Sequence, residues 1–397
     1  MKWTNQGHEF DEIGRRFAKN KKIYIYGLGV LGKELYNKLK WADCVAGFID
    51  NDERKIESGY QQLEVISAIE FLKRPAGEYV VVVAASVSNT SQLMQQLRNK
   101  GYMDSFDLFT CNDFLNFFMP IYLLYAWNRV YFPSIGLTLS TVCNLKCKGC
   151  LAFVPLNKNP RNYSAEMFKE SIDEFFKVVD YVEIFQLSGG ETFLYPQHAE
   201  LLSYIGNNYR NKIHILYTTT NGTIIPDEKT IKAVKEADCT VIVDDYSHSI
   251  HDKMCKIDDI IAIFNKNNIL YFRNKVDKWI DLAPDTTDNN HFAEEELEAY
   301  FAACSQPWCE LFENRLYSCN YAQYAMRAGF IGENDNDYLE LFNLEKSDAA
   351  KVLEFRMGYT KKGYVDFCRR CSGYVLINKN IIEPAVQQEV NQYESER

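Results

Sequence analysis

Three cysteines, Cys143, Cys147 and Cys150, stand within eight residues of one another, directly after the apolar run 134–139. Thiolates spaced C-x3-C-x2-C can hold three irons of a [4Fe–4S] cube and leave the fourth iron open to an external ligand. A structural zinc site normally needs a fourth protein ligand, and no histidine stands near this motif in the sequence. The local sequence therefore predicts an iron–sulfur cluster on a loop that follows a strand.

The first residues of the chain indicate the cellular compartment and therefore the redox state of its cysteines. The first residues, MKWTNQGHEFDEIGRRF, are charged and contain no continuous apolar segment of the kind found in secretory signals. We therefore expect a cytoplasmic protein. In a reducing cytosol, clustered cysteines among the 12 of this chain are better explained as metal ligands than as disulfides.

Charge and hydropathy limit the partners. A net charge of −10 and the lack of a Lys/Arg-rich block disfavour a nucleic-acid partner. The most apolar stretch, 114–127, is interrupted by Asn116 and Pro120 and is shorter than the roughly 20 residues that span a bilayer. We expect no membrane span, and we interpret this stretch as a buried aromatic helix, with a membrane-surface segment as the alternative.

The first 112 residues predict a Rossmann-like domain. Apolar strands are expected at 21–27, 45–49 and 79–85, and helices follow the first and the third of them. The first strand ends in a GxGxxG motif, and an acidic residue follows 18 positions after its last glycine. The candidate nucleotide-binding residues are therefore Gly27, Gly29, Gly32 and Asp50.

This N-terminal region resembles the N-terminal domains of sugar-nucleotide and polysaccharide enzymes, in which the same fold need not bind NAD. A bound nucleotide or nucleotide-sugar and a purely structural or docking role therefore both stay open for residues 1–112.

Strands and helices alternate again from residue 134 to residue 290. This alternation predicts a partial (β/α)6 TIM-type barrel, so the fold class is α/β throughout. An aromatic connector at 113–133 precedes the barrel, a small cysteine-rich extension at 300–380 follows it, and residues 381–397 are expected to be a polar tail.

Two further motifs follow barrel strands. Ser188-Gly189-Gly190-Glu191 comes after the expected strand 182–187, and Thr220-Asn221-Gly222 ends the next one. Active sites of such barrels lie at the C-terminal ends of the strands. Together with Cys143, Cys147 and Cys150, these motifs closely resemble the CxxxCxxC, GGE and TNG stretches of the radical S-adenosylmethionine (radical SAM) superfamily.

The resemblance implies a chemistry and its cofactors. A [4Fe–4S] cluster on the three cysteines would bind S-adenosylmethionine through its open iron, and reductive cleavage would give a 5′-deoxyadenosyl radical that abstracts hydrogen from substrate. The implied cofactor contacts are Ser188, Gly189, Gly190, Glu191, Thr220 and Asn221. The residue before the third cysteine is often aromatic in this superfamily; here it is Gly149, and Phe153 is expected to take that place over the adenine.

A second cysteine set lies downstream. The segment 309–319 predicts a hairpin that turns at Asn314 and brings residues 309 and 319 face to face, and Cys368 and Cys371 form a CxxC knuckle. The set resembles the auxiliary-cluster extension called Twitch, a shorter relative of the SPASM domain. The resemblance implies an auxiliary Fe–S cluster on four of the five cysteines Cys304, Cys309, Cys319, Cys368 and Cys371, with the choice between Cys304 and Cys309 open and a zinc site as the alternative.

The leading hypothesis for the reaction is a radical oxidation or rearrangement of a small polar substrate, either a sugar or a nucleotide-linked sugar. A peptide maturase of SPASM type is the second hypothesis, and a non-catalytic iron–sulfur protein is the third. Asp244, Asp245 and Tyr246 end a barrel strand and are candidates for substrate contact or proton transfer, or for a structural role. An external one-electron reductant of the flavodoxin or ferredoxin type is the expected partner.

Overall fold

The computed structural model describes residues 1–304 and 308–388, and the chain forms two compact units. The smaller unit is built mostly from Gly7–Tyr131, and the larger one mostly from Phe132–Asp348. Helices alternate with parallel strands in both, which confirms the α/β class predicted from the sequence. None of the helices in the described part of the chain could cross a bilayer.

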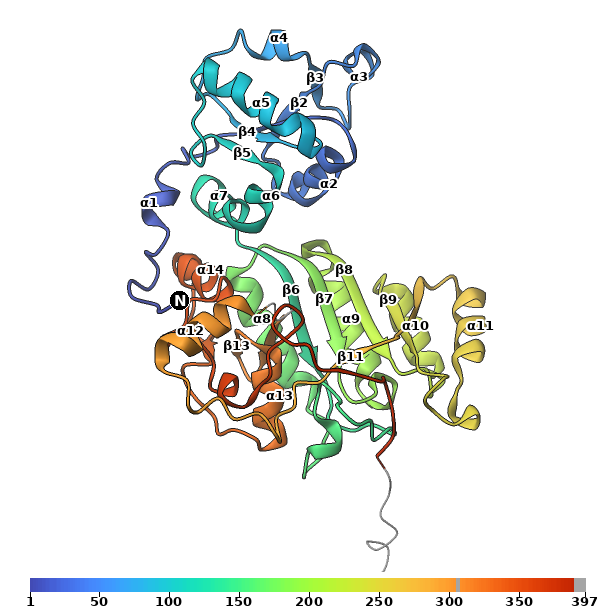
Figure 1. Ribbon diagram of the computed structural model, residues 1–397. Helices are drawn as coiled ribbons and strands as arrows, with labels where there is room; N and C mark the ends of the chain where they lie inside the picture. Colours follow the sequence, from blue (N-terminus) through green and yellow to red (C-terminus); the bar gives the residue numbers. More distant parts are fainter. Residues whose placement is uncertain (305–307, 389–397) are drawn as a thin grey trace, which may run out of the picture. The chain divides into compact units, whose positions relative to one another are not determined.

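The smaller unit contains a parallel sheet whose described strands follow the order β3-β2-β1-β4-β5 (Figure 1). The two neighbouring strands β1 (Ile23–Tyr26) and β4 (Val80–Val83) are buried along their whole length, as expected for the apolar central strands of such a sheet. The other elements are β2 (Val45–Ile49), β3 (Glu64–Ile66), β5 (Leu108–Thr110), α1 (Asp11–Gly14), α2 (Val30–Leu39), α3 (Glu53–Ser58), α4 (Ala68–Phe71), α5 (Val87–Lys100), α6 (Cys111–Asp113) and α7 (Met119–Trp127).

The apolar stretch at 114–127 is helical. A π-helical turn at Phe114–Phe118 leads into α7, and most of the α7 side chains are buried. Tyr122 donates its hydroxyl hydrogen to the Lys21 carbonyl at 2.6 Å. This packing within the smaller unit agrees with the interpretation of the stretch as a buried aromatic helix.

The larger unit contains a sheet in which the described strands follow the order β10-β9-β8-β7-β6-β12-β13-β14. Successive strands β6 to β10 are connected by α8 to α11, which gives the open barrel of Figure 1. Ser164 begins α8 by accepting from the Met167 amide. The bounds are β6 (Tyr131–Thr138), α8 (Ala165–Val178), β7 (Tyr181–Ser188), α9 (His198–Asn208), β8 (Ile213–Thr220), α10 (Glu228–Glu236), β9 (Thr240–Asp245), α11 (Ile257–Asn267) and β10 (Tyr271–Lys275).

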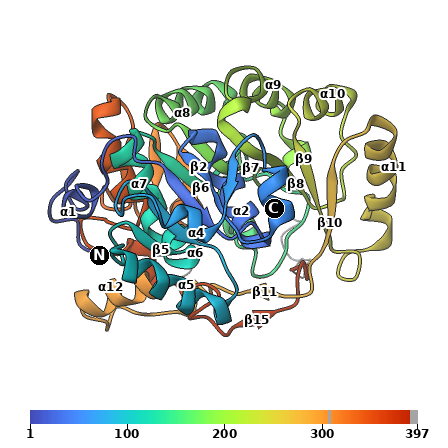
Figure 2. The same cartoon turned by 90° about the horizontal axis from the view of Figure 1, so that it is seen from above.

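The cysteine-rich extension continues this sheet. Strand β12 (Cys309–Phe312) pairs parallel to β6, and β13 (Arg315–Tyr317) turns back along β12. The remaining elements are β11 (Trp279–Ile280), α12 (Glu294–Ala303), α13 (Asn320–Ala328), β14 (Tyr338–Glu340), α14 (Ala349–Arg356) and β15 (Ile381–Ile382). Figure 2 shows β11 and β15 side by side, and they form an antiparallel pair.

The hairpin between β12 and β13 is confirmed, but its predicted register is wrong by one residue. Phe312 faces Arg315 across a two-residue turn, and both turn residues, Glu313 and Asn314, have positive φ. Such turns need left-handed geometry at both positions, which Asn tolerates. Continued outward, this register sets residue 309 opposite residue 318, so Cys309 and Cys319 are not partners across the hairpin.

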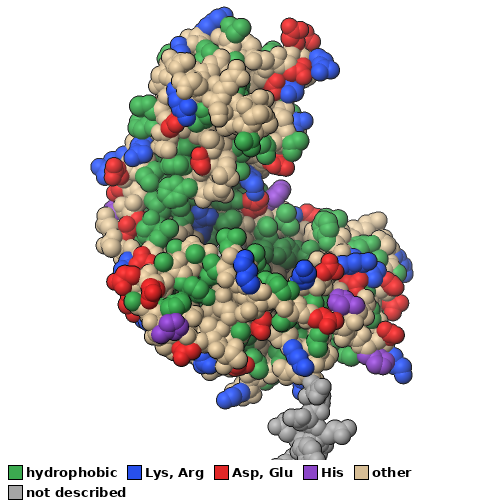
Figure 3. Space-filling model, in the orientation of Figure 1, with side chains coloured by type: hydrophobic (Ala, Val, Ile, Leu, Met, Phe, Trp, Pro, Cys, Tyr) green, Lys and Arg blue, Asp and Glu red, His purple; other side chains and the backbone are tan. Residues whose placement is uncertain are grey.

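Charged side chains are interspersed on the face drawn in Figure 3, where Lys and Arg lie among Asp and Glu. Opposite charges also pair directly, as in Lys169–Glu200 and Arg315–Glu340. The expected lack of a nucleic-acid partner stays a prediction.

Candidate active site

The loop after β6 carries Cys143, Cys147 and Cys150, and all three side chains line one cavity of about 360 Å³. Amide groups point at two of the sulfurs. Asn221 donates from Nδ2 to Cys143 Sγ at 3.7 Å, and the Leu145 amide donates to the same sulfur at 3.4 Å. Gln387 donates from Nε2 to Cys147 Sγ at 3.3 Å. Such donors suit thiolates that ligate a metal cluster.

Burial raises the pKa of the Cys143 thiol to about 12 and that of Cys147 to about 11. The uncoordinated thiols therefore keep their protons at neutral pH. A metal ligand must be deprotonated, so loading of a cluster on this loop would release protons.

The glycines of the Ser188–Glu191 motif are required by the cluster loop itself. A Cβ on Gly190 would lie 2.2 Å from the Val142 carbonyl oxygen, and one on Gly189 would lie 2.9 Å from that of Ser140. Gly190 N–H donates to the Ser140 carbonyl at 2.8 Å. Both glycines also line the cavity, as does Ser188. The absence of side chains thus lets the end of β7 lie directly against the loop that carries the cysteines.

Glu191 lies behind the cavity wall, and it is not among the residues that line the cavity. Its carboxylate accepts from Thr220 Oγ1 at 2.8 Å, from the Asn221 amide at 2.8 Å and from the Phe193 amide at 3.0 Å. The resemblance implies that Glu191 contacts S-adenosylmethionine, and that contact stays a prediction. In the structure its oxygens bind the end of β8, which orients Thr220 and Asn221 in the cavity wall.

The predicted place of Phe153 over the adenine stays a prediction, and the structure shows where the side chain packs. Phe153 is buried in the core of the cysteine-rich extension, with its ring 5.4 Å from Phe330 and 5.7 Å from Phe367. It does not line the 360 Å³ cavity. It does line a neighbouring cavity of about 230 Å³, together with Cys147 and Cys150.

The end of β9 contributes a carboxylate to the cavity. Asp244 accepts from Asn274 Nδ2 at 2.7 Å and from the Tyr246 hydroxyl at 3.2 Å, and all three residues line the cavity. Burial raises the pKa of Asp244 to about 6. Asp245 does not line the cavity and pairs with Arg273 at 2.8 Å.

Four of the downstream cysteines surround a second, much smaller cavity of about 20 Å³: Cys304, Cys319, Cys368 and Cys371. Cys309 does not line it; its strand pairs with β6, where Cys309 aligns with Ile135. Tyr321 and Tyr374 line both cavities, with ring centroids 5.4 Å apart. Two tyrosine rings therefore separate the four cysteines from the larger cavity.

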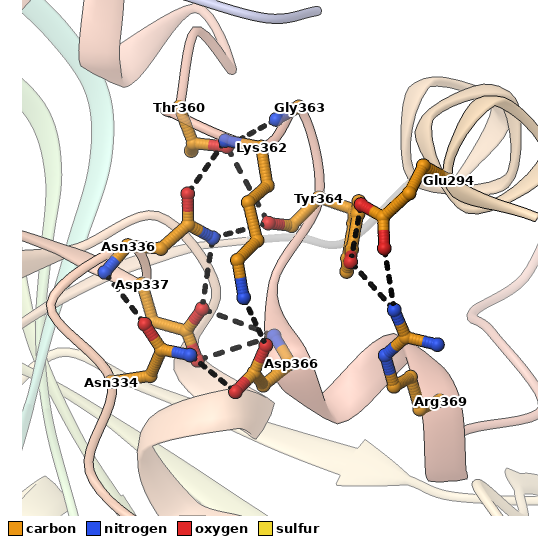
Figure 4. Close-up of polar contacts among 10 residues, drawn as sticks. All are labelled: Glu294, Asn334, Asn336, Asp337, Thr360, Lys362, Gly363, Tyr364, Asp366 and Arg369. Atoms are coloured by element: carbon orange, nitrogen blue, oxygen red, sulfur yellow. Dashed lines mark hydrogen bonds and ion pairs between the residues drawn. The ribbon is translucent and has the colours of Figure 1, made fainter. Parts of the chain in front are cut away.

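The CxxC knuckle is held by a polar network, which Figure 4 draws. The buried carboxylate of Asp337 accepts from the Asp366 amide at 3.0 Å, and Asn336 donates to the Tyr364 carbonyl at 2.7 Å. Arg369 donates to Glu294 at 2.9 Å. Burial raises the pKa of Asp337 to about 7. These bonds connect three chain segments and fix the backbone immediately before Cys368.

No group of three or more His, Cys, Asp or Glu side chains in residues 1–304 and 308–388 is placed to hold a metal ion. The cysteines of each set surround a cavity instead of converging on one point. The donor chemistry, thiols with amide groups directed at them, fits an iron–sulfur cluster.

In the smaller unit, Asp50 is engaged by its own chain. It accepts from the Leu28 amide at 2.9 Å and pairs with Lys55 at 2.7 Å. A Cβ on Gly32 would lie 1.9 Å from the Gly27 carbonyl oxygen, so that glycine is needed for packing. Nucleotide binding by Gly27, Gly29, Gly32 and Asp50 stays a prediction.

Comparison with known proteins gives the family of the barrel. Residues 137–262, which contain the three clustered cysteines and both strand-end motifs, match the radical SAM superfamily. The chain contains a radical SAM domain. Members of this superfamily are enzymes that use a [4Fe–4S] cluster and S-adenosylmethionine.

One curated relative is the antilisterial bacteriocin subtilosin biosynthesis protein AlbA of Bacillus subtilis (strain 168), 31% identical over 117 residues. The match covers 28% of this chain and 24% of AlbA, so the chain spans about a quarter of that relative. Similar solved structures include BtrN in complex with AdoMet and 2-DOIA (14% identity, TM-score 0.38, 61% of this chain and 93% of that one). Streptococcus suis SuiB bound to precursor peptide SuiA is another (17% identity, TM-score 0.31, 53% of this chain and 47% of that one).

The sequence did not point to several residues of the cavity wall. Asn274, Trp279, Trp308, Tyr321 and Tyr374 come from elements far apart in the chain, and no local motif marks them. Gln387 fell in the expected polar tail at 381–397. The part of that segment that the structure describes instead pairs with β11 and with the cysteine loop.

Proposed function

We propose that this radical SAM enzyme oxidises a small, polar, phosphate-free substrate such as a sugar. The observation that supports the proposal is one cavity whose wall runs from the cluster cysteines to Tyr321 and Tyr374, which also line the cavity of the downstream cysteines. A substrate in this cavity would lie between a site that starts the radical chemistry and a site that can complete an oxidation.

The side chains of the wall favour a substrate without phosphate. The described residues that line the cavity include no Lys, Arg or His, and Asp244 is the one carboxylate among them. Phosphate groups are normally bound by cations or by helix N-termini. Amides from Gln186, Asn274 and Asn320 and rings from Trp308 and Tyr321 instead match hydroxyl groups and an apolar ring face.

Asp244 is the proposed proton acceptor. Oxidation of an alcohol carbon to a carbonyl removes one hydrogen atom, one electron and the hydroxyl proton. The bound cofactors would supply the radical that takes the hydrogen atom and an acceptor for the electron. The Asp244 carboxylate, oriented by Asn274 and Tyr246, would accept the proton, and its pKa of about 6 suits a base that works near neutral pH.

The proposed ligands are Cys143, Cys147 and Cys150 for the cluster that binds S-adenosylmethionine, and Cys304, Cys319, Cys368 and Cys371 for an auxiliary cluster. Ser188, Gly189, Gly190, Thr220 and Asn221 form the wall next to the first set and are the proposed contacts of S-adenosylmethionine. A one-electron reductant of the flavodoxin or ferredoxin type is the proposed partner.

Maturation of a peptide is the second candidate, and the sequence similarity to AlbA supports it. AlbA takes part in the biosynthesis of a bacteriocin, and this chain is similar to only part of it. In that case one side chain of a peptide would enter the cavity in place of a free sugar.

The test uses the reconstituted enzyme under anaerobic conditions with S-adenosylmethionine and dithionite. Formation of 5′-deoxyadenosine is expected, and its absence in a cluster-loaded protein would refute the enzyme assignment of this chain. Deuterated free sugars, nucleotide-linked sugars and peptides are then compared by deuterium transfer into 5′-deoxyadenosine. Transfer from a free sugar supports the proposal, whereas transfer from nucleotide-linked sugars alone, or from peptides alone, contradicts it.

A further inference from the structure

The segment 381–388, here called the C-terminal strap, lies against the cluster loop through backbone pairing. Strand β15 at its start pairs with β11. Further along, the Lys148 amide donates to the Val386 carbonyl at 2.7 Å, and the Gln388 amide donates to the Lys146 carbonyl at 2.8 Å. The strap therefore pairs with the stretch of loop that lies between Cys143 and Cys150.

Side chains of the strap fill space next to the cysteines. A Cβ on Gly149, which has φ of +64°, would lie 2.0 Å from Ile382 Cδ1. Ala385 is fully buried in a cluster with Leu145, Cys147 and Tyr246. Gly149 stands where the superfamily often has an aromatic residue, and in this chain Ile382 occupies the adjoining space.

Gln387 makes the contacts that matter for the cluster. Its Oε1 accepts from the Lys146 amide at 2.8 Å, which fixes the orientation of the side-chain amide. Its Nε2 donates to Cys147 Sγ at 3.3 Å and to the Ala385 carbonyl at 2.6 Å. The same side-chain amide thus binds the loop backbone through its oxygen and donates to a proposed cluster ligand through its nitrogen.

We propose that Gln387 is a positioning residue that raises the reduction potential of the cluster on Cys143, Cys147 and Cys150 by donating a hydrogen bond to the Cys147 thiolate. Reduction adds negative charge to the cluster and its sulfurs. A donor aimed at one of them stabilises the reduced state more than the oxidised state, and hydrogen bonds to sulfur are a recognised determinant of such potentials. The inference rests on the proposed ligand set of this cluster.

Two variants and a matched control separate this role from a purely structural one. Gln387→Glu keeps an oxygen for the Lys146 amide but removes the donor to Cys147. Gln387→Met removes the donor without adding charge. Gln388→Glu introduces the same charge one residue along, where the contact of residue 388 with Lys146 is made by the backbone and survives.

The measurement is the midpoint potential of the reconstituted cluster, followed by electron paramagnetic resonance, without substrate or turnover. The signal that changes on addition of S-adenosylmethionine identifies the cluster. We expect Gln387→Glu to be about tenfold harder to reduce, which for one electron is about 59 mV. Gln387→Met should shift the potential in the same direction by less. In Gln388→Glu the equilibrium constant for cluster reduction should stay within about threefold of the wild-type value.

Two results would overturn the proposal: an unchanged potential in both Gln387 variants, or equal shifts in Gln387→Glu and Gln388→Glu. If Gln387→Glu fails to assemble the cluster, the shift in Gln387→Met decides. Failure of the wild-type protein to form 5′-deoxyadenosine would refute the proposed function and leave this titration interpretable.

Discussion

The choice between Cys304 and Cys309 as the fourth auxiliary ligand leads to a quantitative prediction. Cys304 lines the 20 Å³ cavity together with Cys319, Cys368 and Cys371, whereas Cys309 lies on β12 against β6. The variants Cys304→Ala and Cys309→Ala each remove one thiol from the same extension, so each serves as the control for the other.

The expected magnitude follows from the number of ligands. A chain that carries two [4Fe–4S] clusters binds about eight irons and about eight sulfides, and loss of the auxiliary cluster leaves about four of each. We expect the iron content of Cys304→Ala to fall toward about four per chain and that of Cys309→Ala to stay at about eight. Cys309→Ala should cost about 1 kcal/mol of unfolding free energy, because it removes one buried sulfur and no ligand.

The assay is iron and sulfide analysis of anaerobically reconstituted protein, with circular dichroism to verify the fold and zinc analysis alongside it. The reasoning is refuted if Cys309→Ala loses iron while Cys304→Ala retains it. Stoichiometric zinc in place of the second set of irons would show that the four thiols form a zinc site.

Three further predictions concern the cavity and its supports. Replacement of Asp244 by Asn should abolish substrate oxidation while 5′-deoxyadenosine still forms. In wild type the rate of product formation should rise with pH through about 6, because the base must be ionised. A pH profile that is the same in both proteins would contradict the assignment. Gly190→Ala should lower the iron content of the first cluster, because the new Cβ would lie 2.9 Å from Cys143 Cβ. Iron analysis measures this, with Gly332→Ala as the control, since nothing lies within 4 Å of a Cβ at that position. The pKa of Asp337 is raised to about 7 in the folded chain, so its ionisation destabilises the fold, and stability should fall as pH rises from about 4 to about 7. The unfolding temperature should depend less on pH in Asp337→Asn than in wild type across that range. The same pH dependence in both proteins would argue against the assignment.

Much of the architecture was predictable because its signals are local. The runs at β1 and β4 are apolar over the length of a strand, and strands alternate with helices along the chain. Element ends were less accurate. Helix α5 begins at Val87, but most of its first turn is polar, so no apolar periodicity marks this start in the sequence.

The site was predictable where its residues share a motif. Cys143, Cys147 and Cys150 stand on one loop, and both strand-end motifs reach the same cavity because parallel strands end at the same edge of the sheet. For Glu191 and Phe153 the sequence does not fix the side-chain contacts. A carboxylate next to a cofactor motif and an aromatic ring near a cluster both have alternative partners, and only packing decides which partner is closer.

By itself, the sequence determined the chemistry of this chain: thiols at a spacing that leaves one iron open, glycines where backbones meet, and strands that alternate with helices. The tertiary structure alone decided which residues from distant segments share a cavity. It set Cys304 rather than Cys309 beside the CxxC knuckle, and it brought Gln387 to Cys147 across 240 positions of the chain. The physical reason is that metal-ligand spacing and strand periodicity are local properties, whereas register, burial and side-chain direction are fixed only when the elements pack.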